Sequence, residues 1–216
     1  YILTNPVSVN QPVMLVVSDI IVTDVSGCNG NSNGALDISA SGGIGTIFFS
    51  IDGGNNYFDN NGIFDNLASG EYQIFITDDN GCSGEYAGNP VIIGQPTQIS
   101  MDVTSDNVSG CAGNNDGFIS ISATGGTGIY TYSIDGGVNW SSSSDFSGLI
   151  AGSYHVMTRD NQGCTQPYTG NPVVIVEPTA IVYDDVTNID LSCFDSGDGE
   201  IIIAGSGGSG TLAYSI

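Results

Sequence analysis

Cysteines are the residues of this chain whose type and spacing most directly suggest chemistry. The sequence holds five of them, but it has one histidine, His155, and no Cys-x-x-Cys pair. Zinc and redox sites of the usual kind need such pairs, so metal ligation by cysteine is not expected. Disulfide formation is the chemistry that remains, with buried free thiols as the alternative interpretation. The cysteines are Cys28, Cys82, Cys111, Cys164 and Cys193.

Catalytic constellations are missing from the sequence. His155 and the single basic residue, Arg159, are replaced by Gln73 and Thr77 at the equivalent places of an internal repeat described below. No nucleophile elbow, phosphate-binding loop or metalloprotease motif is present. Carboxylates are abundant, but they are spread along turns, where they act as solubilising charge. We therefore predict that the chain is not an enzyme, has no catalytic residues and requires no cofactor.

The charge of the chain excludes two classes of partner. Asp and Glu number 23 against a single Lys or Arg, which gives a formal net charge of −22. Such a surface repels nucleic-acid backbones and anionic lipid head groups. Because no apolar run reaches the length of a membrane-spanning helix, direct membrane insertion is not expected either. The hydrophobic fraction of 40% nevertheless lets the chain bury enough apolar surface to fold.

An internal repeat of about 83 residues organises the chain. Its landmarks follow one another in the same order in successive copies. They are Cys28–Gly34, Cys111–Gly117 and Cys193–Gly199; Ser50–Gly54 and Ser133–Gly137; and Asn5–Pro12, Asn89–Pro96 and Asn171–Pro178. We predict that residues 1–12 are the C-terminal strand of a preceding repeat, that 13–96 and 97–178 are complete repeats, and that 179–216 begin a third. The chain is therefore expected to be a window on a longer array.

The local patterns predict β-sandwich domains. Each copy has about seven short β-type segments separated by Asp-Gly and Asn-Gly turns, and the segment from Glu71 to Asp78 alternates apolar and polar residues as a half-buried strand does. A Leu-x-x-Gly-x-Tyr motif, ending at Tyr72 and again at Tyr154, matches the tyrosine corner of Greek-key sandwiches. Proline at the joints, Pro96 and Pro178, limits flexibility. We predict an all-β chain of tandem immunoglobulin-like Greek-key sandwiches in a rod-like array.

The repeat also suggests how the cysteines pair. Cys28 and Cys82 frame the first copy, and Cys111 and Cys164 frame the second, whereas Cys193 opens a third copy whose closing cysteine would lie beyond the sequence. Pairing within each copy closes loops of roughly 55 residues, for which the chain-entropy model gives about 4 kcal/mol. We therefore predict the disulfides Cys28–Cys82 and Cys111–Cys164.

Two further kinds of site are candidates. If a disulfide joins the turns of one copy, hard oxygen ligands beside glycine could bind Ca²⁺; the alternative is that these residues merely cap hairpin turns. The calcium candidates are Asn31, Asn33, Asp78 and Asp79 in the first copy, and Asn114, Asp116 and Asp160 in the second.

The sequons at Asn107 and Asn139 are candidate glycosylation sites, with chance matches as the alternative. Trp140 could stack on a sugar or pack against the domain.

The order of these motifs resembles the SprB repeat of Bacteroidetes cell-surface proteins. The motifs that carry the resemblance are Cys111 to Gly117, Gly125 to Gly137, Leu149 to Tyr154 and Asp160 to Cys164. The first copy departs from the pattern at Ile47 and Phe48, and the third lacks the glycine of Cys-x-Gly, having Asp195 instead.

The resemblance implies a long protein exported by the type IX secretion system to the extracellular cell surface. It further implies an adhesin, which in some members of the family is a filament used in gliding. Expected partners are neighbouring repeats, other copies in a filament, and surface glycans or substrata. The alternatives are a glycan- or ligand-binding module and the stalk of a large secreted enzyme.

Overall fold

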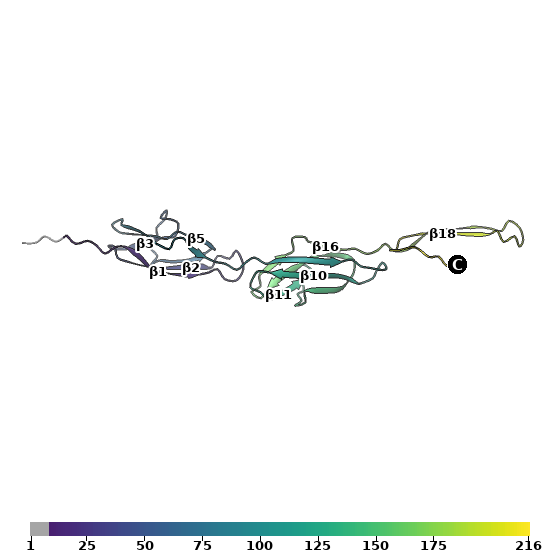
Figure 1. Cartoon of the computed structure of the whole chain (residues 1–216), viewed down its shortest axis with the longest axis horizontal. Coiled ribbons are helices and arrows are strands. Elements are labelled where there is room, and N and C mark those ends of the chain that lie inside the picture. Colours follow the sequence, from purple (N-terminus) through teal and green to yellow (C-terminus); the bar gives the residue numbers. More distant parts are fainter. Residues whose placement is uncertain (1–8) are drawn as a thin grey trace, which may run out of the picture. The chain divides into compact units, whose positions relative to one another are not determined.

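The protein is an all-β chain. A computed structural model describes residues 9–216, in which every regular element is a β-strand (Figure 1). No helix long and apolar enough to cross a membrane occurs in this described part of the chain. The Asn5-Pro motif and most of the strand predicted for residues 1–12 lie outside the described residues.

The chain divides into two compact units. One contains the residues up to Gln98 together with the short turn Gln162–Cys164, and the other contains Ile99–Asn161 and Thr165–Ile216. Strands β1 to β8 belong to the first unit. They are Val16–Thr23, Gly34–Ser41, Ile47–Ser50, Ile63–Leu67, Gly70–Tyr72, Phe75–Asp78, Ser83–Glu85 and Val91–Ile93.

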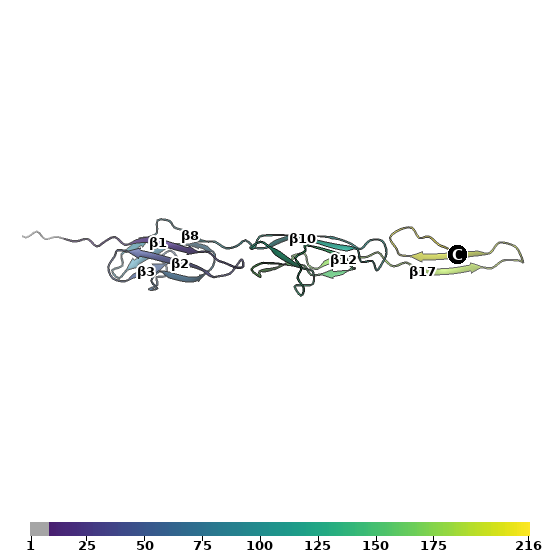
Figure 2. The same cartoon turned by 90° about the horizontal axis from the view of Figure 1, so that it is seen from below.

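Two three-stranded antiparallel sheets form the first unit. One has the order β1-β2-β4 and the other β3-β6-β7, while β5 pairs with β8. Figure 2 labels β1, β2, β3 and β8 of this unit. In the first sheet Ile20 lies opposite Ile38. Because strand side chains alternate between faces, β2 buries Leu36 and Ile38, and they pack with Ile74 and Ile76 in one hydrophobic core. Each such side chain contributes roughly 1.5–3 kcal/mol on full burial.

The second unit repeats this arrangement strand for strand. Sheets β9-β10-β12 and β11-β14-β15 enclose the core, and β13 pairs with β16. Ile119 and Ile121 take the places of Leu36 and Ile38, and Val156 takes that of Ile74. Strands β9 to β16 are Ser100–Asp106, Gly117–Thr124, Tyr130–Ser133, Asp145–Leu149, Gly152–Tyr154, Met157–Asp160, Thr165–Pro167 and Val173–Ile175.

An asparagine side chain completes the hydrogen bonding where one strand is interrupted between β5 and β6. The amide of Asn89 accepts from the Ile74 backbone N–H at 2.8 Å and donates to the Ile74 carbonyl at 3.0 Å. Asn171 makes the same pair of bonds with Val156, at 2.7 and 2.8 Å. Both backbone groups belong to fully buried residues, so an unpaired N–H or carbonyl there would be costly. This role explains why Asn-Pro recurs in each copy.

The predicted tyrosine corners are present in both units. The Tyr72 hydroxyl donates to the Ala68 carbonyl, and the Tyr154 hydroxyl donates to the Ile150 carbonyl, both at 2.9 Å. Each tyrosine is the last residue of the short strand, β5 or β13, that follows a Leu-x-x turn, and its bond back to the upstream backbone is that of the tyrosine corner. The corner, the two facing sheets and the shared core together confirm the prediction of immunoglobulin-like β-sandwich folds.

The C-terminal segment forms an antiparallel hairpin of β17 (Val182–Ile189) and β18 (Glu200–Ser206). Its sequence matches β1–β2 and β9–β10, but its apolar side chains are exposed. Ile201 is 56% exposed, whereas its counterparts Leu36 and Ile119 are fully buried. The hairpin therefore has the apolar face of a sandwich without the sheet that covers it in the other two copies.

Candidate functional site

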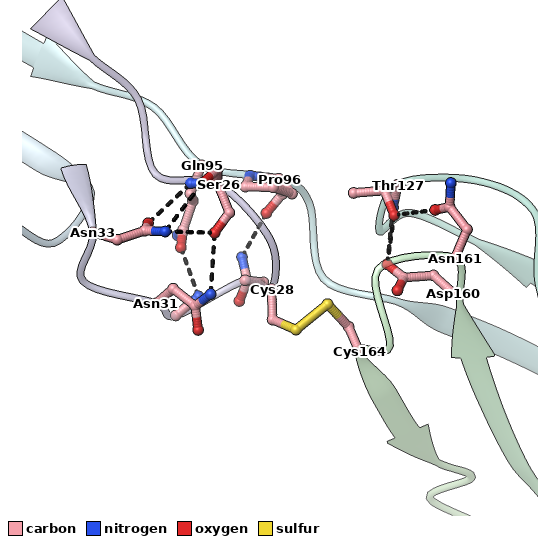
Figure 3. Close-up of a disulfide and its surroundings, with 12 residues drawn as sticks. Ser26, Cys28, Asn31, Asn33, Gln95, Pro96, Thr127, Asp160, Asn161 and Cys164 are labelled. Atoms are coloured by element: carbon pink, nitrogen blue, oxygen red, sulfur yellow. Dashed lines mark hydrogen bonds between the residues drawn. A yellow bond between two sulfur atoms is a disulfide. The ribbon is translucent and has the colours of Figure 1, made fainter.

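The disulfide of the structure joins two different repeats. Cys28 of the first repeat is bonded to Cys164 of the second, with a Cα–Cα distance of 5.4 Å and a sequence separation of 136 (Figure 3). Cys82, Cys111 and Cys193 are free and exposed. The predictions that Cys28 and Cys164 are disulfide-bonded residues are confirmed, but the predicted pairings Cys28–Cys82 and Cys111–Cys164 are wrong.

Cys28 lies at the end of its repeat where the chain leaves for the next one. The backbone N–H of Gly30 donates to the Gln95 side chain at 2.8 Å, and the Asn29 side chain donates to the Pro96 carbonyl at 2.8 Å. Gln95 and Pro96 form the joint that follows β8. The cysteine turn is therefore fastened to the exit from its own repeat, as Figure 3 shows for Gln95 and Pro96.

Cys82 lies at the opposite end of the same repeat, where the chain enters. It follows β6 in a tight turn, in which its N–H donates to the Asp78 carboxylate at 2.9 Å. Asp78 also accepts from the Ile44 N–H at 2.9 Å, and Cys82 lines a surface pocket together with Pro12 and Val13. These contacts place Cys82 beside the entry joint, before β1 begins.

The length of β1 explains why the within-repeat pairing fails. This strand of eight residues connects the entry end to the exit end and therefore spans about 25 Å. A disulfide needs Cα atoms roughly 4.4–6.8 Å apart. Cys28 and Cys82 thus frame the repeat in sequence while lying at its two ends in space. Repeat boundaries alone could not reveal this, because they do not show to which end each turn is fastened.

The turn that carries Cys28 is stabilised locally by asparagine side chains. Asn33 accepts from the Ser26 N–H at 3.0 Å and donates to the Ser26 hydroxyl at 3.0 Å, while Asn31 donates to the Ser26 carbonyl at 3.0 Å. Gly30 has a φ of 85°, a left-handed conformation that favours glycine. In the third copy Asp195 stands there with a φ of 66°, and aspartate tolerates that conformation better than most residues.

The carboxylates predicted as calcium ligands accept hydrogen bonds within turns. The Ile44 N–H is the main cause that keeps the pKa of Asp78 below its usual value, and the Ser109 hydroxyl does the same for Asp116. Asp79 accepts from the Thr46 N–H, and Asp160 from the Thr127 hydroxyl. Within residues 9–216 no group of three or more His, Cys, Asp or Glu side chains is placed to hold a metal ion.

The calcium hypothesis also assumed that one disulfide joins the two turns of a single copy, and that assumption is wrong. Asn31 and Asn33 lie at the exit end of the first repeat, whereas Asp78 and Asp79 lie at its entry end. Asn114 donates to the Ser109 carbonyl at 2.9 Å in the second copy of the exit turn. The alternative interpretation, in which these residues cap turns, describes the observed hydrogen bonds.

A pair of aspartates that sequence reasoning did not single out caps the loop of the Ser-Ile-Asp-Gly-Gly motif. Asp52 accepts from the Asn56 N–H at 3.0 Å, and Asp135 accepts from the Asn139 N–H at 2.9 Å. These backbone donors are the main cause that lowers the pKa of each carboxyl to about 2. The recurrence of the motif in both copies was the signal that could have identified them.

The candidate glycosylation residues also take part in turns. Asn107 accepts from the Val176 N–H at 3.0 Å, and the Asn139 amide donates to the Asp135 carboxylate at 2.7 Å. Trp140 donates through Nε1 to the Gly137 carbonyl at 2.9 Å. The Arg159 guanidinium lies 4.4 Å from the centre of the Trp140 ring, a cation–π contact. The Trp140 side chain is therefore half-buried and packs against its own loop.

The fold and the site together define a class of protein, a tandem-repeat chain of immunoglobulin-like sandwiches with a disulfide between successive repeats. Residues 20–56 and 103–139 match the family model of the SprB repeat. The resemblance to SprB repeats is thereby confirmed in both complete copies. No curated protein matches the chain.

Similar solved structures were also found. Three N-terminal domains of the highly immunogenic outer capsid protein (Hoc) of bacteriophage RB49 align with 12% identity and a TM-score of 0.41, covering 89% of this chain and 71% of that one. A C-terminal 282-residue fragment of intimin, solved with the intimin-binding domain of the translocated intimin receptor, aligns with 15% identity and a TM-score of 0.33. That alignment covers 78% of this chain and 67% of the fragment.

Proposed function

We propose that this chain is a structural segment of a secreted cell-surface adhesin or extracellular filament. Its SprB repeats act as spacers that give reach and multivalent attachment. The observation that carries the proposal is the disulfide between Cys28 and Cys164, because it fastens successive repeats to each other covalently. A cross-link placed between repeats resists extension of the array, which is what a load-bearing spacer requires.

The surface chemistry of the chain supports a structural role outside the cell. Disulfides persist in oxidising, extracellular compartments. The net charge of −22 keeps neighbouring copies soluble and repels anionic surfaces. The family resemblance supports export by the type IX system, and gliding is one use to which such a filament is put. Neighbouring repeats of the same chain are the first partners, and other copies, glycans or a substratum are the partners proposed for the assembled protein.

A sugar-binding role for each repeat receives less support from the site. The indole N–H of Trp140 is already bonded within its loop, and Arg159 covers the ring. The first copy has Tyr57 at the position of Trp140, and its ring lies against Gly54 as the Trp140 ring lies against Gly137. Because both rings pack against their own loops, local packing accounts for the aromatic residue at this position in each copy.

The proposal is tested on intact cells of the source organism. Antibodies raised against residues 9–216 should label the cell surface in immuno-electron microscopy, and extracellular protease should remove the label without lysis. Cells lacking the gene should attach less well to a substratum under flow. A label confined to the cytoplasm would overturn the proposal. A normal attachment phenotype, together with a catalytic domain in the same polypeptide, would favour the stalk of a secreted enzyme.

A further inference from the structure

We propose that Cys82 and Cys111 are each one half of the same cross-link, so that every joint of the array carries a disulfide between neighbours. We call the cysteine that opens a repeat, such as Cys28 or Cys111, its first-position cysteine, and the one near its end, such as Cys82 or Cys164, its second-position cysteine. Cys111 pairs with the second-position cysteine of the repeat that follows it along the chain. Cys82 pairs with the first-position cysteine of the repeat that precedes it. This inference rests on the proposed function and specifies how the spacer is held together.

The turn around Cys111 reproduces the turn around Cys28. The Asn114 N–H donates to the Cys111 carbonyl at 3.2 Å, as the Asn31 N–H does to the Cys28 carbonyl at 3.1 Å. The Gly113 N–H donates to the Glu177 carboxylate at 2.6 Å, as Gly30 does to Gln95. Cys111 is therefore fastened to the exit joint of its own repeat, in the setting from which Cys28 reaches its partner.

The turn around Cys82 likewise corresponds to the turn around Cys164. Both cysteines follow an aspartate by four residues, and that aspartate is buried and bound to a loop near the entry joint. Asp78 accepts from Ile44 and Asp160 accepts from Thr127. Cys82 is exposed at this end. It thus presents a thiol where Cys164, its counterpart, holds a disulfide with the first-position cysteine of the previous repeat.

The repeat therefore supports the same kind of cross-link for both thiols. One disulfide of this kind is present between a first-position and a second-position cysteine, and the two unpaired cysteines occupy the two halves of that same arrangement. Cys193 opens the third copy in the same way, with the Ser196 N–H donating to the Cys193 carbonyl at 3.2 Å. By the same rule it pairs with the second-position cysteine of a fourth repeat.

Each cross-link forms by thiol–disulfide exchange with an oxidant of the disulfide class. Two protein thiols lose two protons and two electrons and become one S–S bond, while the oxidant disulfide takes them up and becomes two thiols. The thiolate of one cysteine attacks the oxidant, and the second cysteine then displaces the resulting mixed disulfide. No other co-reactant is needed.

The cross-links overlap along the chain. The loop closed by Cys28 and Cys164 contains Cys111, whose own loop extends into the next repeat. A covalent path can therefore pass from Cys28 to Cys164, along the backbone to Cys193 and onward through the next disulfide. Between these two cysteines it follows roughly 30 residues of backbone, or at most about 100 Å. Unfolding of the sandwiches then adds little length to an oxidised array.

The test maps disulfides in the natural polypeptide isolated from its source without reduction. The culture is moved from unlabelled to ¹⁵N medium midway through synthesis of the protein, so that each cell carries both unlabelled and labelled copies. Free thiols are blocked with iodoacetamide, the protein is cleaved with Asp-N protease, and linked peptides are identified by mass spectrometry. We expect the Cys111 peptide joined to the second-position cysteine of the next repeat, the Cys82 peptide joined to the first-position cysteine of the previous one, and both linked peptides of a single isotope composition.

Several outcomes would overturn the inference. These are iodoacetamide-blocked Cys82 or Cys111, a bond between two cysteines of one repeat, or linked peptides of mixed isotope composition, which would show that the partner is a second copy. A natural polypeptide without a following repeat would also contradict it. A chain found on the cell surface with disulfides only inside repeats would overturn this inference while leaving the proposed function intact. The expected linked peptides in a secreted polypeptide that also carries a catalytic domain, from cells whose attachment does not depend on it, would do the reverse.

Discussion

At the scale of single residues, Cys164 has two candidate partners that one proteolytic cut can distinguish. Arg159 is the single tryptic site of the chain. With free thiols blocked and the chain unfolded in urea, trypsin should release residues 1–159 and 160–216, still joined through Cys28–Cys164. On a non-reducing gel the cleaved chain should therefore run as one species and separate after reduction.

Two serine variants provide the matched pair for this experiment. In Cys28→Ser the two tryptic fragments should separate without reductant, because Cys164 has lost its partner. In Cys111→Ser they should stay joined. If the pairing lay within the repeat, the two variants would exchange behaviour, with Cys111→Ser separating and Cys28→Ser remaining whole.

A second prediction at this scale concerns Asp135, whose pKa is lowered to about 2 mainly by the Asn139 backbone N–H. In the unfolded chain an aspartate has a pKa of about 3.9. A carboxyl with a lowered folded pKa stabilises the fold above its unfolded pKa, and that contribution is lost as the pH falls from about 4 towards 2. Asp135→Asn should therefore lower the Tm at pH 7, and the difference from the unmodified chain should shrink over that interval.

The control for this prediction is Asp102→Asn, which removes the same charge from an exposed position in β9. Because the chain carries a net charge of −22, losing a negative charge there relieves repulsion and should leave the Tm unchanged or slightly higher. Thermal melts followed by circular dichroism between pH 2 and 7 provide the measurement. A constant Tm difference for Asp135→Asn across the whole range would contradict the assignment.

At the scale of elements, the Asn171 side chain takes the place of a strand where β13 and β14 are separated. Asn171→Ala removes both hydrogen bonds to Val156 and leaves a buried N–H and a buried carbonyl without partners. Loss of these bonds should cost about 2 kcal/mol, or roughly 10 °C in Tm for a domain of this size. The fluorescence of Trp140, the single tryptophan, reports the unfolding of the second unit.

The matched variant is Asn89→Ala, which removes the same bonds from Ile74 in the first unit. In a Cys28→Ser background, which lacks the disulfide to the second repeat, it should leave the Trp140 transition unchanged and destabilise only the first unit. Asn171→Asp keeps an acceptor for the Val156 N–H but has no donor for the Val156 carbonyl. Its Tm should therefore fall between those of the unmodified chain and Asn171→Ala. Equal shifts of the Trp140 transition in Asn89→Ala and Asn171→Ala would contradict the prediction, because they would show that each asparagine does not stabilise its own unit alone.

Most of the elements could be predicted from sequence because they depend on local signals. Alternation in the strands, the Asx-Gly turns and the corner at Tyr72 are each encoded within about ten residues. The cysteine pairing depends on something else, namely which end of the sandwich each turn is fastened to. That is set by hydrogen bonds between residues far apart in sequence, such as Gly30 with Gln95. A repeat pattern shows that such a pair recurs, but it does not show that the two residues meet.

At the scale of the whole molecule, the cross-link changes which part of the chain bears tension. The loop closed by Cys28 and Cys164 contains every strand from β2 to β14, while β1 and β15 to β18 lie outside it. In the chain-entropy model a loop of this length stabilises the folded state by about 5 kcal/mol. Tension applied at the termini passes through the disulfide and bypasses the residues of the loop.

Single-molecule stretching of the 216-residue chain, tethered at its two ends, measures this bypass directly. The 136-residue separation within the disulfide loop corresponds to about 450 Å of extended backbone. The oxidised chain should therefore reach full extension about 450 Å shorter than the reduced chain, and adding reductant under load should release that length in one or more unfolding steps. Cys28→Ser should show the full length without reductant, and Cys111→Ser should behave as the oxidised chain does.

Within-repeat pairing would hide two loops of roughly 55 residues each, or about 360 Å together, and Cys28→Ser would recover only half of that length. The size of the recovered step therefore shows whether load passes between repeats through sulfur or through the folded sandwiches.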